Sequence, residues 1–147
     1  MAMGIPDERL YEYAVVRYVP RVDREEFVNI GLIMMSKRSK WLRGEIRLDG
    51  ARLRAFDPGV NLESLQKQAS VFMRGDVPSP EVPVEERYRW LSAVKSAVLQ
   101  VSPSHPGILV REGDPSCRER GSGDSGQSIA ARLDAEFERL FDDLVCC

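Results

Sequence analysis

Residues 12–36, EYAVVRYVPRVDREEFVNIGLIMMS, predict two neighbouring strands of one antiparallel sheet. Residues 12–19 and 27–36 are rich in β-branched, aromatic and aliphatic side chains, and the alternating faces of each run are largely apolar. The charged connection between them starts at Pro20, which has no amide hydrogen to give to a central strand. We therefore expect two buried strands that are covered on both sides, with Arg17 interrupting one apolar face.

Residues 41–48, WLRGEIRL, alternate regularly and predict a third strand that lies near an edge of the sheet. One set of side chains should point into the core and the other towards water, because the two sets differ sharply in polarity. The expected inward residues are Leu42, Ile46 and Leu48, and the expected outward residues are Arg43, Glu45 and Arg47.

The remainder of the chain is expected to form helices and short strands. Helices are predicted over residues 50–56, from Asn61 to Gly75, from Glu85 to about Ser96 and after Ser128, and short strands over 98–101 and 108–110, separated by a break at 102–107. The last helix has the clearest pattern, since its apolar side chains repeat at spacings of four, four, three and four. Residues 77–83 are typical of a stiff connector, and residues 113–128 of a poorly ordered Gly/Ser-rich loop.

Length and composition favour one domain. The 147 residues are 43% hydrophobic and 30% charged, which is ordinary for a globular protein of this size. We therefore predict a single domain of the α+β class over residues 1–147. It should contain an antiparallel sheet of three to five strands, two to three packed helices and a C-terminal amphipathic helix.

The sequence indicates a soluble protein of the cytoplasm. It has a net charge of -2, no run of about 18 apolar residues, and no basic and apolar signal-peptide pattern at its start. We expect free thiols in a reducing compartment, no membrane association, no metal site and no cofactor. A P-loop, a dinucleotide-binding glycine motif, a nucleophile elbow and an HExxH zinc motif are absent from the sequence. The cysteines, which lack metal-ligand spacing, are Cys117, Cys146 and Cys147.

Arg17, Glu26 and Asn29 form the core of a candidate polar site. A buried guanidinium is costly unless neighbours neutralise it, and Glu26 and Asn29 lie across the first hairpin from Arg17. The three side chains could line an anion or phosphate pocket, or they could form a polar clasp that holds the strand register. We favour the clasp, because buried polar groups usually satisfy one another. At Gly31 we favour a β-bulge over the close approach of a ligand or another backbone.

His105, the only histidine, lies in a proline-bounded turn with Ser102 and Ser104 nearby. A histidine titrates near neutral pH and could serve as a general base. A catalytic triad also needs an orienting carboxylate and an oxyanion hole, and the sequence identifies neither. We therefore favour a turn residue, and an enzymatic site would require His105 to converge with the Arg17 cluster.

Residues 37–54 carry seven Lys and Arg residues against two acidic residues. Basic side chains around an exposed aromatic ring suit phosphate contact and base stacking, so nucleic acid is one interpretation. Strand edges also carry basic residues that discourage edge pairing, which is the interpretation we favour, and an acidic protein partner would fit the same surface. The candidate patch consists of Lys37, Arg38, Lys40, Trp41, Arg43 and Arg47.

Residues 13–34, YAVVRYVPRVDREEFVNIGLIM, resemble the opening of an uncharacterised bacterial family that is classed as a domain of unknown function. The resemblance continues in RWLSAV at 89–94, in SPSHPG at 102–107 and in LFDDLV at 140–145, although the Gly/Ser-rich insertion is longer than in the family. It implies an accessory role, because the family's genes are associated with genes for HipA-like kinases. The positions that carry the opening motif are Arg17, Pro20, Glu26, Phe27, Asn29 and Gly31.

Three functional hypotheses follow from these patterns. The first is a non-enzymatic accessory module that binds a protein partner, such as a HipA-like kinase, through the basic hairpin or the acidic last helix. Residues 113–147 carry four basic against eight acidic residues, which makes the second surface acidic. The alternatives are a nucleic-acid-binding protein that uses residues 37–54 with Trp41 stacking on bases, and an enzyme or anion-binding protein with a pocket around Arg17.

Overall fold

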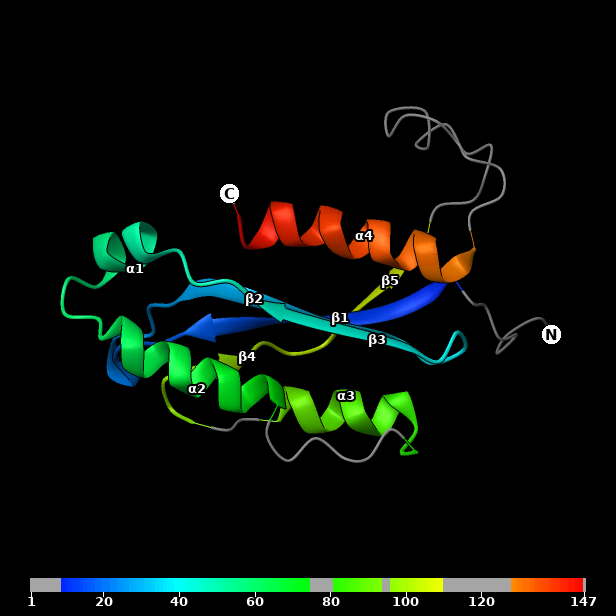
Figure 1. Cartoon of the computed structure of the whole chain (residues 1–147), viewed down its shortest axis with the longest axis horizontal. Coiled ribbons are helices and arrows are strands. Elements are labelled where there is room, and N and C mark those ends of the chain that lie inside the picture. The colour runs from blue at the N-terminus through cyan, green and yellow to red at the C-terminus, as the bar shows by residue number, and fades with distance from the viewer. Residues whose placement is uncertain (1–8, 75–80, 94–95, 110–127, 147) are drawn as a thin grey trace.

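The computed structural model describes residues 9–74, 81–93, 96–109 and 128–146. Figure 1 shows a single sheet with helices packed against it, which confirms the predicted α+β class and the C-terminal helix. The elements in chain order are β1 (Leu10–Tyr18), the 3-10 turn η1 (Val22–Arg24), β2 (Val28–Ser36), β3 (Trp41–Ile46), α1 (Gly50–Phe56), α2 (Leu62–Arg74), α3 (Val84–Ser92), β4 (Leu99–Val101), β5 (His105–Ile108) and α4 (Ile129–Leu144).

β1 is the central strand of the sheet. The strand order is β3-β2-β1-β4, and β5 also pairs with β1. The pairing partners of β5 are residues 10–13 and those of β4 are residues 16–18, so the two short strands follow one another along the same edge of β1. Every strand pair is antiparallel, and β3 forms the opposite edge of the sheet, as its alternating sequence predicted.

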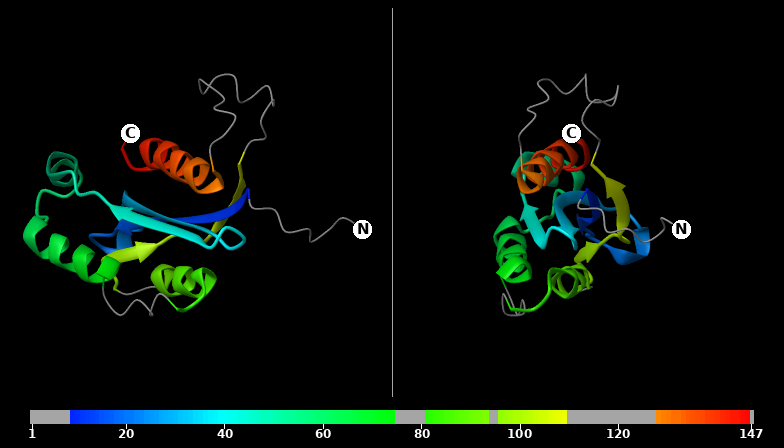
Figure 2. Two further views of the ribbon diagram at one scale, coloured as in Figure 1. Left: turned by 45° about the vertical axis from the view of Figure 1, so that its right-hand side comes forward. Right: turned by 90° about the vertical axis from the view of Figure 1, so that its right-hand side faces the viewer.

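Helices cover both faces of the sheet. Figures 1 and 2 show α2 and α3 on one face and α4 on the other. The side chains of Ala14 and Val16 belong to the core beneath α2 and α3, whereas Tyr11 and Val15 belong to the core beneath α4. The expected two-sided burial of the first strand is therefore confirmed. The core beneath α4 also contains Leu32, Met34, Leu109, Leu133, Phe137, Leu140, Phe141 and Val145.

Side chains cap three of the helices. Asn61 Oδ1 accepts a hydrogen bond from the Ser64 amide at 3.0 Å, and Ser128 Oγ accepts one from the Ala131 amide at 3.2 Å. Each bond satisfies an amide that has no partner within the first turn of its helix. Both N-caps were predicted from the sequence and are confirmed. Asp49 caps α1 in the same way.

The predicted end of α3 is wrong. We expected the helix to reach about Ser96, but it ends at Ser92 and Ala93 has extended backbone angles. The Ser92 hydroxyl donates to the Tyr88 carbonyl at 2.7 Å, a local bond that competes with the regular helix pattern. The helix therefore ends before the predicted boundary.

The predicted limits of the last strand are also wrong. We expected a break at 102–107 and a strand at 108–110, but β5 already begins at His105. Pro106 is tolerated because β5 lies at the margin of the sheet. Gly107 is required there, since a Cβ atom would lie 2.3 Å from the ring of Tyr11. Pro106 and Gly107, which the sequence analysis assigned to a turn, therefore belong to a strand that packs against the ring of Tyr11.

Two predicted segments lie largely outside the described residues. Only residues 81–83 of the connector at 77–83 are described, and only Ser128 of the loop at 113–128. Among the described helices, none is both long enough and apolar enough to cross a lipid bilayer.

Candidate functional site

A bulge in β2 sets the geometry of the first hairpin. Gly31 and Asn29 are opposite consecutive residues of β1, so Ile30 is an extra residue on β2. The bulge that we expected at Gly31 is therefore confirmed. Gly31 also approaches β3 closely, since a Cβ atom there would lie 2.6 Å from the carbonyl oxygen of Glu45. The bulge places Asn29 directly opposite Arg17.

Arg17 is half-buried and stacks on an aromatic ring. Its Cζ lies 4.1 Å from the ring centroid of Phe27. Among the described residues, its buried Nε has no hydrogen-bond partner and no carboxylate forms an ion pair with its guanidinium. Glu26, the acidic partner that we expected, instead contacts Arg24, with 2.7 Å between Oε1 and Nε. The guanidinium of Arg17 is thus compensated by the ring and not by an opposite charge.

Asn29 holds the end of α4. Its Nδ2 donates to the carbonyl oxygen of Leu144 at 3.0 Å, while its Oδ1 is buried and has no hydrogen-bond partner in the described part of the chain. The unsatisfied atom of Arg17 is a donor and that of Asn29 is an acceptor, and the two residues are cross-strand neighbours. The structure therefore brings two of the predicted clasp residues together, but the side-chain hydrogen bond of Asn29 goes to α4.

A cavity of about 230 Å³ lies at the C-terminal end of α4. Arg52, on its wall, donates through Nη1 to the carbonyl oxygen of Val145 and, at 3.4 Å, to that of Asn29. These bonds satisfy a carbonyl that the helix leaves unpaired at its end. Arg47 donates to Cys146 Sγ at 3.3 Å. Because both arginines are engaged with the end of α4, we assign the cavity to anchoring of this helix.

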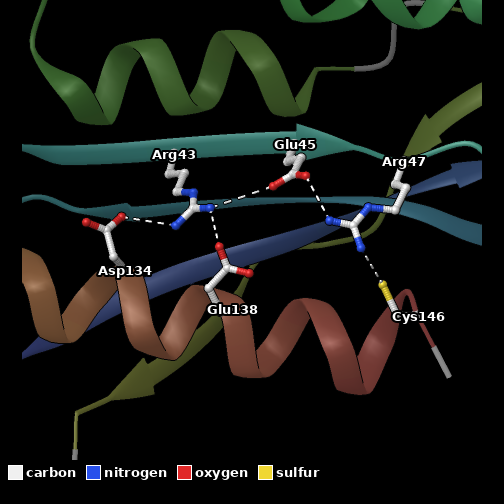
Figure 3. A network of polar contacts seen from close by, with 6 residues as sticks. All are labelled: Arg43, Glu45, Arg47, Asp134, Glu138 and Cys146. Carbon is white, nitrogen blue, oxygen red and sulfur yellow. Dashed lines mark hydrogen bonds and ion pairs between the residues drawn. The ribbon is translucent and has the colours of Figure 1, made fainter.

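The charged side chains of β3 face α4, as Figure 3 shows. Arg43 Nη1 donates to Asp134 Oδ1 at 3.2 Å, and Nη2 donates to Glu138 Oε1 at 2.5 Å. Arg43 also lies over the ring of Phe137, with 4.3 Å between Cζ and the ring centroid. The expectation that Arg43 points towards open water is therefore wrong, because α4 covers this side chain and leaves it 29% exposed. Arg47 is 55% exposed, in agreement with the prediction.

The electrostatics of Arg43 follow from these contacts. Burial disfavours its charged form, but the hydrogen bonds and charges of Glu138 and Asp134 outweigh burial and raise the pKa of Arg43. Arg47 continues the same row, with Nη2 3.2 Å from Glu45 Oε1. We call the three arginines that contact α4 or its C-terminal end the α4 clasp, namely Arg43, Arg47 and Arg52.

The predicted basic patch divides into two parts. Lys37, Arg38 and Lys40 lie exposed in the turn between β2 and β3, and we call them the exposed tip. Trp41 is partly buried against the core beneath α4, so only part of its ring is accessible for stacking on a base. The remaining arginines of the patch belong to the α4 clasp.

His105 lies apart from Arg17. It pairs with Tyr13 across β5 and β1, with 5.2 Å between the two ring centroids. Arg17 is four residues further along β1, which corresponds to about 13 Å in a strand. Ser102 Oγ accepts a hydrogen bond from the Val15 amide at 2.9 Å, which engages it in the sheet. The four residues of the predicted polar cluster therefore do not converge on one point.

One buried polar pair was missed by the sequence analysis. The hydroxyl of Tyr11 donates to Glu136 Oε2 at 2.7 Å, and Glu136 Oε1 also accepts from Arg139 Nε at 2.6 Å. Burial and the bond to Glu136 raise the pKa of Tyr11 above its ordinary value. The helical spacing of Glu136 and Arg139 was visible in the sequence, but the contact with Tyr11 spans 125 residues and left no local signal.

Comparison with protein families finds a match over most of the chain. A family model described as a protein of unknown function (DUF3037) matches residues 13–114, which is more than half of the chain. The chain belongs to the DUF3037 family. This confirms the predicted resemblance to an uncharacterised family. No curated protein and no solved structure matched the chain.

The DUF3037 match separates the candidate residues by location. Arg17, Phe27, Asn29 and the basic residues of the α4 clasp all lie within residues 13–114. α4, which receives those arginines, lies beyond the end of the matched region. The clasp therefore joins the part of the chain that matches the family to a helix outside that match.

Proposed function

We propose that this chain is a non-enzymatic accessory protein that binds a protein partner, and that Arg17 and Phe27 anchor that partner. One observation carries the proposal. The half-buried guanidinium of Arg17 lies over a phenyl side chain that is 44% exposed, and among the described residues it has no carboxylate partner.

The lack of a compensating charge supports a ligand group from outside the chain. A charge that is held partly out of water is costly until an opposite charge or hydrogen bonds compensate it. Arg43 provides an internal reference, because it also stacks on a phenylalanine ring but binds the carboxylates of Asp134 and Glu138. A partner carboxylate at Arg17 would complete the same arrangement.

The surroundings of Arg17 support a protein surface as the source of that carboxylate. Val22 of η1, in the same connection between β1 and β2 as Phe27, is 55% exposed. Arginine and aromatic side chains are enriched among the residues that contribute most to protein interfaces. The expected partner therefore presents an acidic side chain beside an apolar one.

The family resemblance supports a HipA-like kinase as the class of partner. The basic hairpin and the acidic last helix, which we first considered as binding surfaces, contact each other through the α4 clasp. Arg17 and Phe27 form a different candidate surface, which the contacts of the α4 clasp do not occupy. Both residues lie in the region that matches the family.

The proposal is tested by co-expressing the chain with a HipA-like kinase, the proposed class of partner, and measuring affinity by calorimetry. We expect a stable complex and a loss of affinity of about ten-fold or more for Arg17→Ala and for Phe27→Ala, the size expected for a central interface residue. Arg24→Ala is the matched control, because Arg24 lies in the same hairpin, is 61% exposed and forms an ion pair with Glu26 of the same connection.

Two results would contradict the proposal. One is separate elution of the two proteins from a sizing column at about 10 µM, a concentration at which a stable complex persists. The other is unchanged affinity of Arg17→Ala in a complex that does form. Arg17→Lys separates charge from geometry, because lysine keeps the charge but lacks the planar guanidinium that stacks on a ring and forms two hydrogen bonds to a carboxylate.

A second candidate function, nucleic-acid binding, is favoured by the exposed tip. Lys37, Arg38 and Lys40 lie together in one turn, and no described carboxylate forms an ion pair with them. We expect fluorescence anisotropy with single-stranded and duplex oligonucleotides at low salt to show binding that Lys37→Glu/Lys40→Glu removes. Lys67→Glu on α2 is the control. If no oligonucleotide binds at low salt, this candidate function is excluded.

A further inference from the structure

The outer edge of β3 carries backbone groups that have no partner among the described residues. The Arg47 amide donates to the Ile30 carbonyl at 2.7 Å. This bond fixes the hydrogen-bond phase of the β2–β3 pair, that is, which residues of β3 direct their N–H and C=O groups towards β2. Alternate residues of an edge strand turn their N–H and C=O groups towards and away from the neighbouring strand. No hydrogen bond within the described part of the chain reaches the outward set, which is Leu42, Gly44 and Ile46.

The sequence of β3 is complementary to itself around Gly44. When a second β3 is placed antiparallel with the two Gly44 residues opposite each other, Arg43 lies opposite Glu45 of the second copy. The same arrangement places Leu42 opposite Ile46 of the second copy. Unlike charges therefore meet on the face of α4, and apolar side chains meet on the face of α2. Directly opposed pairs of both kinds stabilise antiparallel sheets.

The hydrogen-bond phase and the charges select the same register. The outward residues Leu42, Gly44 and Ile46 are those that this arrangement pairs with one another, so their free groups meet. A shift of the register by two residues also preserves the phase. It would place either Arg43 opposite Arg43 or Glu45 opposite Glu45, and like charges directly opposite each other are destabilising.

We propose that two copies of this chain associate through β3, antiparallel and in register around Gly44, to form one continuous sheet. This interface is separate from the proposed partner site at Arg17 and does not depend on it. Figure 2 shows β3 at the margin of the sheet, with α4 on one of its faces and α2 on the other. The charged residues of β3, which we first interpreted as protection against edge pairing, thereby specify one pairing partner.

Amide hydrogen exchange tests the proposed pairing on the unmodified chain. In the dimer the amides of Leu42, Gly44 and Ile46 become hydrogen-bonded, so their exchange should slow at least ten-fold as the concentration rises from about 5 µM to 500 µM. The amides of Arg43 and Glu45, which already face β2, should be protected at both concentrations. Fast exchange of the three outward amides at the high concentration overturns the proposal, whatever the oligomeric state.

Charge reversal provides a second test that is specific for the register. Glu45→Arg places two arginines opposite each other, and Arg43→Glu places two glutamates opposite each other, so each variant alone should dimerise about ten- to a hundred-fold more weakly. In a mixture of the two variants every opposed pair is again unlike, and a heterodimer should form. Glu63→Arg, with a side chain 83% exposed on α2, is the matched control and should dimerise like the unmodified chain.

Sedimentation velocity of each protein and of the mixture gives the result. Restored association in the mixture supports the register around Gly44, whereas two variants that remain monomeric together contradict it. Arg43→Glu also removes contacts with α4, so its folding is checked first by circular dichroism. If it does not fold, Glu45→Arg and the exchange experiment still decide, because a dimer that survives Glu45→Arg unchanged contradicts the proposal.

Discussion

Among the arginines that stack on phenylalanine rings, Arg17 and Arg43 differ in their surroundings. Arg43 lies over Phe137, which is completely buried, and binds two carboxylates of α4. Arg17 lies over Phe27, which is 44% exposed, and among the described residues it binds no carboxylate. The difference separates a contact that completes the fold from one whose charge remains uncompensated. Stability should therefore depend on Arg43, and binding on Arg17.

The largest expected effect is on the ring beneath Arg43. Phe137→Ala removes a completely buried side chain from the core beneath α4 and should lower the free energy of unfolding by about 3–5 kcal/mol. Urea denaturation followed by circular dichroism measures this change. Val71→Ala, at a position 64% exposed on α2, should change it by less than about 0.5 kcal/mol. A loss below about 1 kcal/mol for Phe137→Ala would mean that α4 contributes little to the fold.

Removal of the Arg43 guanidinium should have a smaller effect. Arg43→Met deletes the ring contact and two ion pairs to α4, and we expect a loss of about 1–2 kcal/mol in the free energy of unfolding. The loss should shrink in about 0.5 M salt, because salt screens the partly exposed pairs. Urea titrations at low and high salt measure both values. Equal stability of Arg43→Met and the unmodified chain at low salt would remove the contrast with Arg17.

Tyr18, on the opposite face of the sheet, allows comparison of the two arginines with an uncharged side chain. Burial and a hydrogen bond from its hydroxyl to Asp57 at 2.7 Å raise the pKa of Tyr18 from 10.0 to about 12. The folded state thus favours the protonated phenol, and its stabilising contribution is complete below pH 10 and lost between pH 10 and 12. Tyr18→Phe should lose less stability than the unmodified chain across this interval. Urea denaturation at several alkaline pH values tests this prediction. If the stability of Tyr18→Phe and of the unmodified chain fell equally with pH, the raised pKa of Tyr18 would be contradicted.

The smallest expected effect on stability is that of Arg17. Arg17→Met keeps an apolar contact with Phe27 and removes a charge without an acidic partner, so the free energy of unfolding should change by less than about 0.5 kcal/mol. The same urea titration used for Arg43→Met gives the value. A loss above about 1.5 kcal/mol would show that Arg17 is a structural clasp, as we first favoured, and would weaken its role as a binding anchor.

Local patterns predicted the elements that depend on nearby residues. The two buried strands and the N-caps at Asn61 and Ser128 follow from side chains close together in the sequence, and the structure contains all of them. The β-bulge at Gly31 could also be predicted, because a glycine within an otherwise apolar strand is a local signal. These features need no knowledge of where distant segments lie.

The candidate site was less predictable because its contacts are distant in sequence. The bond between Arg43 and Asp134 spans 91 residues, so the alternation of β3 correctly separated two faces but could not show that α4 covers the charged one. Asn29 was correctly placed beside Arg17, because strand pairing in a hairpin brings neighbours together. Glu26 was not, because it lies in the connection and pairs with a residue even closer in sequence.

The contact between Gly107 and Tyr11 has a consequence for variation within the family. A side chain at position 107 would occupy the space of the aromatic ring, so it is compatible only with a smaller residue at position 11. Relatives that keep an aromatic residue at position 11 should therefore keep glycine at position 107. Relatives that lose the glycine should show a compensating substitution across the two strands.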